Sequence, residues 1–223
     1  MQIVYDEEHW LILKTLRGWA LDMLNLLEQG SMRGFVYGSV ARGDVKATSD
    51  VDVIVFAPNI VWLDLIEADH KFIVQATPSS TPKAYISLDR EERKVISFPL
   101  GKLSGVEEDF YRFGGLVDKE QLIKGERVPG VNKDLQIIIP NEMGHEELPL
   151  KGNEDLAVKL VKVSMNTILQ RERLLSRRKE RGRTGTFLNY ELREDESFQE
   201  AVRNLLKENK FFRRTIDRGS YKG

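Results

Sequence analysis

The sequence predicts an α+β fold, with a mixed sheet and helices followed by a mainly helical C-terminal part. Three observations support this prediction. Apolar residues recur with a helical period over residues 6–29, strand-like stretches and a hairpin pattern occupy residues 34–100, and the helical period returns from Asn153.

The first of these stretches, "DEEHWLILKTLRGWALDMLNLLEQG", predicts a long amphipathic helix that begins with acidic residues and ends at Gly30. "GFVYGSV" and "DVDVIVF" predict strands, and "NIVWLDLIEADHKF" predicts a helix. After the Pro/Ser loop "TPSSTP", "KAYISLD" and "KVISFPL" are joined by "REER" in a hairpin pattern. We place the end of the first domain at residue 105.

The remaining chain is divided into two further parts. Residues 106–150 contain a strand signal at "LQIIIP" and several turns, and we expect a connector packed on the first domain. Residues 151–223 are expected to form a basic helical domain. Its helices are predicted to start after Asn153 and after Ser197, which stands three residues before Glu200 at capping-box spacing.

Charge and composition limit the function only weakly. The 223 residues carry a net charge of −1, but residues 151–223 hold 18 basic and 11 acidic side chains. An acidic body with a basic tail favours a polyanionic partner for the tail, and a solvated charged surface is the alternative. With no cysteine, no clustered histidines and no long apolar run, we expect a soluble, cytoplasmic protein without disulfides or thiolate zinc sites.

Two aspartates in an apolar strand raise the question of function. In "SDVDVIVF", residues two apart share one face, so Asp50 and Asp52 are neighbours on a strand whose other face is filled by valines. Two adjacent carboxylates repel each other and resist desolvation, and a hard cation such as Mg²⁺ removes both costs. The alternative is that these aspartates only end the strand or cap a loop.

The preceding segment, "GSVARG", favours the ligand-binding interpretation. Gly38 ends a strand without a side chain, so a ligand can approach its backbone. Ser39 is a candidate cap of a short helical turn, and Arg42 stands one turn later, where it can meet a phosphate. Together with the two aspartates, this pattern predicts a site for a nucleoside triphosphate.

The whole stretch "GSVARGDVKATSDVDV" resembles the signature of the DNA polymerase beta-type nucleotidyltransferase superfamily. More loosely, "FYRFGG", "RVPGV", "LQIIIP" and "GHEELP" resemble a group of archaeal predicted nucleotidyltransferases without an assigned substrate. The resemblance implies a nucleotidyltransferase fold and transfer of a nucleoside monophosphate from an NTP to an acceptor hydroxyl.

It also implies roles for individual residues. Asp50 and Asp52 would hold two Mg²⁺ ions, and Gly38, Ser39 and Arg42 would hold the β and γ phosphates. Ser49 belongs to the same signature, and we expect it to fix the loop. The superfamily usually supplies a third carboxylate from a later strand; Ile96 and Ser97 stand there, so Asp89 is the candidate, with an ordinary hairpin charge as the alternative.

The segment "VKLVKVSMNTI" resembles a helix-turn-helix, although Lys162 stands where a turn glycine is usual. "TGTFLNYEL" is a candidate wing. The following helix is rich in basic residues that are candidates to contact RNA or DNA: Arg171, Arg173, Arg177, Arg178, Lys179, Arg181 and Arg183. A plain helical subdomain with a solvated basic face is the alternative.

Three functions remain open from the sequence. The first is an Mg²⁺-dependent nucleotidyltransferase whose basic tail recruits a nucleic acid or another acidic acceptor. The second is a non-catalytic, nucleotide-sensing regulator that binds nucleic acid. The third is an enzyme that adenylylates a protein.

Overall fold

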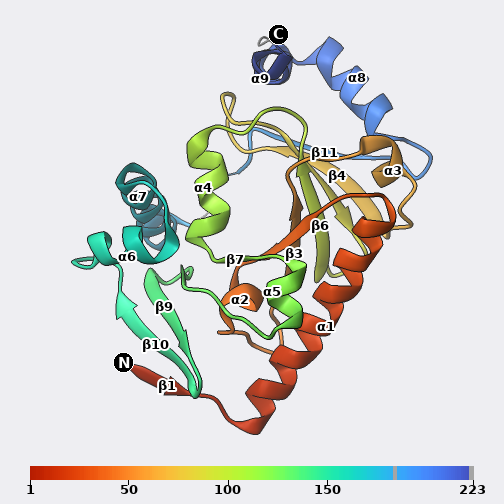
Figure 1. Ribbon diagram of the computed structural model, residues 1–223. Helices are drawn as coiled ribbons and strands as arrows, with labels where there is room; N and C mark the ends of the chain where they lie inside the picture. The colour runs from red at the N-terminus through yellow and green to blue at the C-terminus, as the bar shows by residue number, and fades with distance from the viewer. Residues whose placement is uncertain (183–184, 221–223) are drawn as a thin grey trace. The chain divides into compact units, whose positions relative to one another are not determined.

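The computed structural model describes residues 1–182 and 185–220 (Figure 1). The fold is α+β, as predicted, with a mixed sheet and several helices. Its contacts group the chain into two compact units that interleave along the sequence. Unit 1 takes the described residues of 1–22, 35–51 and 105–184, and unit 2 takes those of 23–34, 52–104 and 185–223. The prediction from sequence was of three consecutive parts.

Helix α1, Glu7–Gln29, contributes its first part to unit 1 and its last part to unit 2. The Asp6 carboxylate accepts a hydrogen bond of 2.8 Å from the backbone N–H of His9, which satisfies a free amide of the first turn. Most of the predicted apolar stripe is buried, at Leu13, Leu16, Ala20, Met23, Leu24 and Leu27, whereas Leu11 near its start is exposed.

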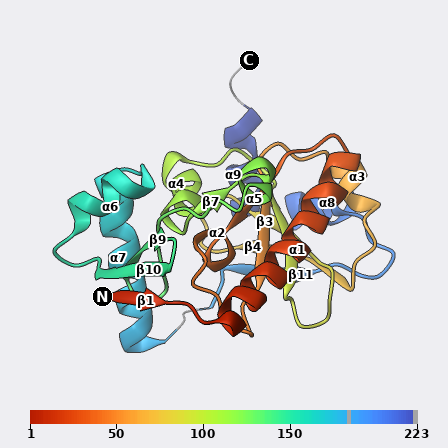
Figure 2. The ribbon, with the colours of Figure 1, turned by 60° about the horizontal axis from the view of Figure 1, so that its bottom comes forward.

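Unit 1 contains an antiparallel four-stranded sheet of order β1-β10-β9-β8, in which β1 lies alongside β10 (Figure 2). The predicted strand "LQIIIP" is β9, and the whole of this sheet apart from β1 lies in the stretch predicted as a connector. Unit 1 also contains the short β2–β7 pair. Its further elements are β1 Gln2–Val4, β2 Gly34–Tyr37, α2 Ser39–Arg42, α4 Gly105–Phe113, β7 Leu116–Val117, α5 Lys119–Ile123, β8 Gly130–Val131, β9 Gln136–Asn141, β10 Gly144–Pro149, α6 Glu154–Val161 and α7 Met165–Arg181.

Helices α6 and α7 lie side by side and close over a core formed with β8 and β9 (Figure 1). Lys162 adopts a left-handed conformation (φ 54°, ψ 46°) at the end of α6, and Ser164 caps α7 by accepting from the backbone N–H of Thr167. The carboxylate of Asp109 on α4 accepts from the Thr167 hydroxyl at 2.8 Å. Two helices joined by a short turn therefore occupy the segment that resembles a helix-turn-helix.

Unit 2 is built on strands in the order β11-β4-β5-β6-β3, and the predicted β5–β6 hairpin is confirmed. Helix α8 packs on this sheet, with the Phe198 ring edge-on to Phe98 at 5.1 Å, and also contacts α3. The capping box of Ser197 and Glu200 is confirmed at the start of α8. The elements are β3 Val51–Val55, α3 Ile60–Asp64, β4 His70–Gln75, β5 Lys83–Ser87, β6 Lys94–Pro99, β11 Leu188–Glu191, α8 Phe198–Glu208 and α9 Lys210–Ser220.

Two local predictions are wrong. The helix expected through "NIVWLDLIEADHKF" ends at Asp64, and the chain then forms β4, because pairing with both β5 and β11 outweighs local helical propensity. The candidate wing is β11, which pairs with β4 as an edge strand of the unit 2 sheet.

No helix among the described residues is long and apolar enough to span a bilayer.

Candidate functional site

The two aspartates stand at the beginning of β3. Asp50 directly precedes the strand and is exposed, whereas Asp52 is half-buried as the second residue of the strand. Val51 and Val53 on either side of Asp52 are fully buried. The predicted strand is therefore confirmed over Val51–Val55, with one carboxylate just before it and the other at its second residue.

The carboxylate of Asp52 acts on Tyr85 of β5. Burial, and then the charge of Asp52, raise the pKa of the Tyr85 hydroxyl to about 12. Tyr85 is the cross-strand partner of Ser97 on β6, and the Ser97 hydroxyl donates to the Val53 carbonyl at 3.3 Å. Tyr85 and Ser97 thus belong to the surroundings of Asp52.

Asp89, the candidate third carboxylate, lies in the turn between β5 and β6. Its side chain accepts from the backbone N–H of Arg93 at 2.7 Å, and its carbonyl accepts from the Ser87 hydroxyl at 2.6 Å. These contacts favour the alternative of an ordinary hairpin residue. Across residues 1–182 and 185–220, no group of three or more His, Cys, Asp or Glu side chains is arranged to hold a metal ion.

The Gly-Ser corner has a backbone that requires glycine. Gly38 has φ 84° and ψ −147°, a conformation that side-chain-bearing residues rarely adopt, and its N–H donates to the Gly115 carbonyl at 3.0 Å. A Cβ atom on Gly38 would meet nothing within 4 Å, so the space above it is open. Ser39 is the first residue of α2, with Gly38 in the capping position, and no side chain caps this helix as had been expected of Ser39.

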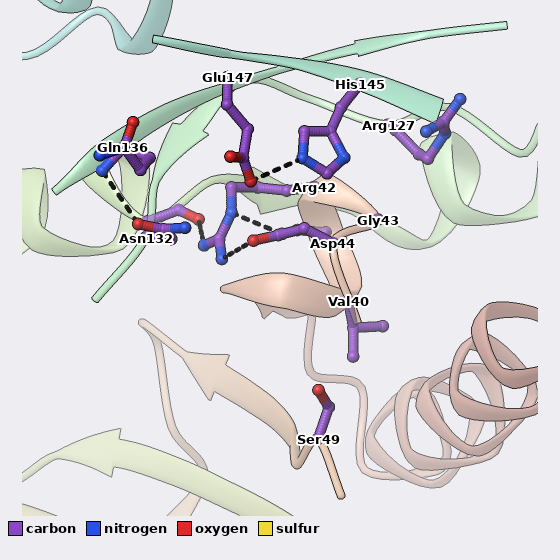
Figure 3. A network of polar contacts seen from close by, with 12 residues as sticks. Val40, Arg42, Gly43, Asp44, Ser49, Arg127, Asn132, Gln136, His145 and Glu147 are labelled. Carbon is purple, nitrogen blue, oxygen red and sulfur yellow. Dashed lines mark hydrogen bonds and ion pairs between the residues drawn. The ribbon is translucent and has the colours of Figure 1, made fainter. Parts of the chain in front are cut away.

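The structure gives Arg42 contacts within the protein, where a phosphate contact was expected. Its Nε and Nη2 each donate to the Asp44 carboxylate at 2.9 Å, and its Nη1 donates to the Gly114 carbonyl at 2.6 Å. Figure 3 shows the guanidinium directed at Asp44. Because Arg42 is only 5% exposed, its guanidinium is committed to this internal pair.

Glycines leave room for the Arg42 side chain. A Cβ atom on Gly130 would lie 2.6 Å from the Arg42 Cδ and 2.6 Å from the Gly114 carbonyl oxygen. One on Gly115 would lie 2.8 Å from the Arg42 Cγ. The glycines of "FYRFGG" and "RVPGV" therefore leave the space that the Arg42 side chain occupies.

A second arginine, Arg17 of α1, forms hydrogen bonds to α2. Arg17 donates to the carbonyls of Val40 and Ala41 at 3.2 Å each, which satisfies acceptors that the short helix leaves open. Burial, and then the charge of Arg127, lower the pKa of Arg17 to about 10.

Ser49 fixes its own loop, as expected, because its hydroxyl accepts from the backbone N–H of Lys46 at 2.8 Å.

The basic residues of α7 have different surroundings. Arg171 lies over the rings of Phe110 and Phe113, at 4.7 and 5.7 Å, and burial lowers its pKa to about 10. This arginine therefore packs inside unit 1 and is removed from the candidate nucleic-acid contacts. Arg183 lies outside the described residues. The other candidates are exposed: Arg173, Arg177, Arg178, Lys179 and Arg181.

A polar network near this corner was not predicted. The Tyr5 hydroxyl lies 2.6 Å from His145 Nδ1, and His145 Nε2 lies 3.0 Å from the Glu147 carboxylate. Burial, and then the charge of Asp44, raise the pKa of Tyr5. His145 and Glu147 stand on β10 (Figure 3), and their spacing of two residues, which places them on one face of a strand, was the available signal.

Comparison with known proteins adds one finding. The sequence model of a family described as nucleotidyltransferase domain matches residues 28–140. This range includes the Gly-Ser corner, Asp50 and Asp52 at the beginning of β3, and the strands of the "REER" hairpin. No curated protein and no solved structure matched the chain.

Proposed function

Because the chain belongs to the nucleotidyltransferase domain family, of the polymerase beta-like kind, we propose that it transfers a nucleoside monophosphate from an NTP to an acceptor hydroxyl. The acceptor oxygen forms a bond to the α-phosphorus. The bond from that phosphorus to the oxygen bridging to the β-phosphate breaks, pyrophosphate leaves, and the hydroxyl proton passes to solvent.

One observation carries this proposal. The matched range contains Asp50 and Asp52 at the beginning of β3, and Asp52 is half-buried between two fully buried valines. Both aspartates supply oxygen donors from neighbouring positions of the chain. Such a donor set suits a hard divalent cation.

The residues of the chain have distinct roles in this proposal. Asp50 and Asp52 would hold Mg²⁺, which when bound neutralises phosphate charge and polarises the α-phosphoryl group. Gly38 leaves open space over its backbone, and Ser39 offers a hydroxyl beside it, so these two residues would bind the leaving phosphates. We assign Arg42 to positioning this corner through Asp44 and Gly114.

A transfer assay tests the proposal. The protein is incubated with each α-labelled NTP, Mg²⁺ and total cellular RNA, DNA or protein. We expect label in an acceptor, and we expect Asp50→Asn and Asp52→Asn each to lower the transfer rate by about a hundredfold or more, because a ligand charge is lost. Near-UV circular dichroism should remain unchanged.

Asp134→Asn is the matched control, because it removes an exposed carboxylate from the turn before β9. It should transfer at the wild-type rate. A wild-type rate in Asp50→Asn or in Asp52→Asn would refute the metal assignment. Label in protein would support protein adenylylation, and nucleotide binding without any transfer would support the regulator.

We further propose that α7 recruits a nucleic acid to the enzyme. The observation that favours this partner is the exposed basic side of the helix, where a hollow of about 500 Å³ is lined by Glu172, Arg173, Ser176, Arg177, Glu180 and Arg181. Its arginines can neutralise phosphates, whereas its two glutamates limit the positive charge. DNA and RNA both fit this chemistry.

A further inference from the structure

Helix α2 is too short to hold its own shape. It has four residues, Ser39–Arg42, and it lies between Gly38 and Gly43, which both have positive φ. A single isolated turn is unstable, because fixing its backbone costs more free energy than its hydrogen bonds supply. The corner assigned to the leaving phosphates, Gly38 and Ser39, therefore depends on contacts from other elements.

Gly43 connects one such contact directly to the corner. Its N–H donates to the Ser39 carbonyl at 2.7 Å, and its own carbonyl oxygen lies 2.8 Å from Nε2 of His9 on α1. A carbonyl can only accept, so Nε2 of His9 carries a proton and donates it. Arg127 leaves Gly43 little room, since a Cβ atom on Gly43 would lie 2.7 Å from the Arg127 Cδ. His9 is thus linked to Ser39 through a single residue.

The ring of Tyr5 holds the ring of His9. The two rings are stacked, with centroids 3.5 Å apart and planes 22° from parallel. Tyr5 is buried and His9 is half-buried. The guanidinium of Arg127 lies 5.7 Å from the centroid of the Tyr5 ring. The stack therefore restricts the His9 imidazole, so that its Nε2–H stays directed at the Gly43 carbonyl.

Two hydrogen bonds fix Tyr5 in turn. The Glu147 carboxylate only accepts, so His145 Nε2, which lies 3.0 Å from it, carries a proton (Figure 3). His145 Nδ1 is then an acceptor, and the Tyr5 hydroxyl donates to it at 2.6 Å. Tyr5 and His145 are only 7% and 4% exposed, so water hardly competes for this bond. The hydroxyl stays protonated, because burial, and then the charge of Asp44, raise the pKa of Tyr5.

We propose that His9 is a positioning residue for the nucleotide site: by donating to the Gly43 carbonyl it fixes α2, so that Gly38 and Ser39 keep the geometry that binds the triphosphate. The proposal rests on the proposed function. The residues from His9 to Glu147 that carry it all belong to unit 1, as does the corner itself. The role is one of geometry, because His9 acts through Gly43 and Ser39.

Equilibrium dialysis of a triphosphate tests this role without requiring transfer. The probe is an NTP with a methylene group in place of the oxygen between the α- and β-phosphorus atoms, with Mg²⁺ present. His9→Phe keeps a ring that can stack on Tyr5 but has no N–H to donate. We expect it to weaken binding of the probe about tenfold, which corresponds to about 1.4 kcal/mol. His9→Gln lacks the ring, but its amide can donate to the Gly43 carbonyl, so its affinity should stay within about threefold of wild type.

His9→Leu is the second variant, should His9→Phe fail to fold, and it should weaken binding of the probe equally. Thr167→Val is the matched control, because it removes a buried hydrogen bond of unit 1 that joins α7 to Asp109 on α4. It should unfold at lower urea concentration than wild type and bind the probe equally well. Equal binding by wild type, His9→Phe and His9→Leu would overturn the proposal. So would losses of equal size in His9→Gln and His9→Phe, or in Thr167→Val and His9→Phe.

The same dialysis separates the failure of this role from the failure of the proposed function. A chain that binds the probe in dependence on His9 but transfers no label would refute the transfer reaction and leave the positioning role standing. A chain that transfers label, and whose KM for NTP is the same in His9→Phe and wild type, would refute the positioning role and leave the reaction standing.

Discussion

At the residue scale, two side chains with similar sequence signals have different roles. Asp52 is half-buried on a strand within the range matched by the family model, whereas Arg42 is buried in a pair with Asp44. The difference arises from neighbours distant in sequence, because Gly114 supplies the acceptor and Gly130 supplies the space that hold Arg42. A basic residue in a signature can therefore form hydrogen bonds within the protein and need not contact a ligand.

The pair of Arg42 and Asp44 leads to a prediction about stability. Arg42→Lys removes the two parallel hydrogen bonds to Asp44, because an ammonium cannot present the planar fork of a guanidinium. We expect a loss of about 2 kcal/mol in the free energy of unfolding, measured in urea, because buried hydrogen bonds to a charged carboxylate are lost while the positive charge is kept. Asp44→Asn should have an effect of similar size.

Arg90→Lys, at an exposed arginine in the turn between β5 and β6, is the control and should leave stability unchanged. A fully stable Arg42→Lys variant with impaired NTP binding would contradict the structural role of Arg42. It would support the contact between Arg42 and a phosphate that the sequence predicted.

At the element scale, α7 has two sides with separate functions. Its inner side carries Thr167 and Ile168 into the core of unit 1 and places Arg171 over two phenylalanine rings. Its outer side presents the exposed basic residues. The helix is therefore held by packing, so charge on its outer side can be removed without removing the contacts that hold it.

Replacement of Arg177, Arg178 and Arg181 by Gln should weaken nucleic-acid binding. Fewer counterions are released when fewer phosphates are neutralised, so the slope of log K against log salt should become shallower by about 0.9 for each lost contact to duplex DNA. Fluorescence anisotropy of a labelled duplex or RNA over a salt series measures this slope.

Gln replacements at Lys133, Lys151 and Lys159 provide the matched control, because they remove the same charge from exposed positions of unit 1 outside α7. A slope that is the same in both triple variants would contradict specific recruitment by α7.

At the scale of the whole molecule, the two compact units do not follow each other along the chain. Each unit collects three separate stretches, and α1 contributes to both. The last part of the chain supplies β11 and α8 to unit 2, where they pair with β4 and pack on Phe98. The N-terminal hundred residues therefore depend on the C-terminal ones for completing a core.

A fragment of residues 1–105 should not fold alone. Without α8 and β11 it exposes Phe98 and the edge of β4, so we expect no cooperative urea transition and little near-UV circular dichroism. The full chain, measured in parallel, is the control. A cooperative transition in the fragment would contradict this dependence.

The sequence by itself determined the elements whose signals are local. The periodicity of α1, the strands β2 and β3, the β5–β6 hairpin and the capping box at Ser197 are properties of neighbouring residues, and each was predicted correctly. The signature around Asp50 and Asp52 also predicted the family, because it too is a short run of neighbouring residues, and the family match over residues 28–140 confirms it.

Only the tertiary structure decided where long-range partners lie. It made β4 a strand, joined β11 to it, placed Gly114 and Gly130 against Arg42 and packed Arg171 on Phe110. It also brought Tyr85 on β5 within the electrostatic reach of Asp52. These outcomes depend on contacts between residues far apart in the chain, whose energies exceed local propensity and which no short window of sequence contains.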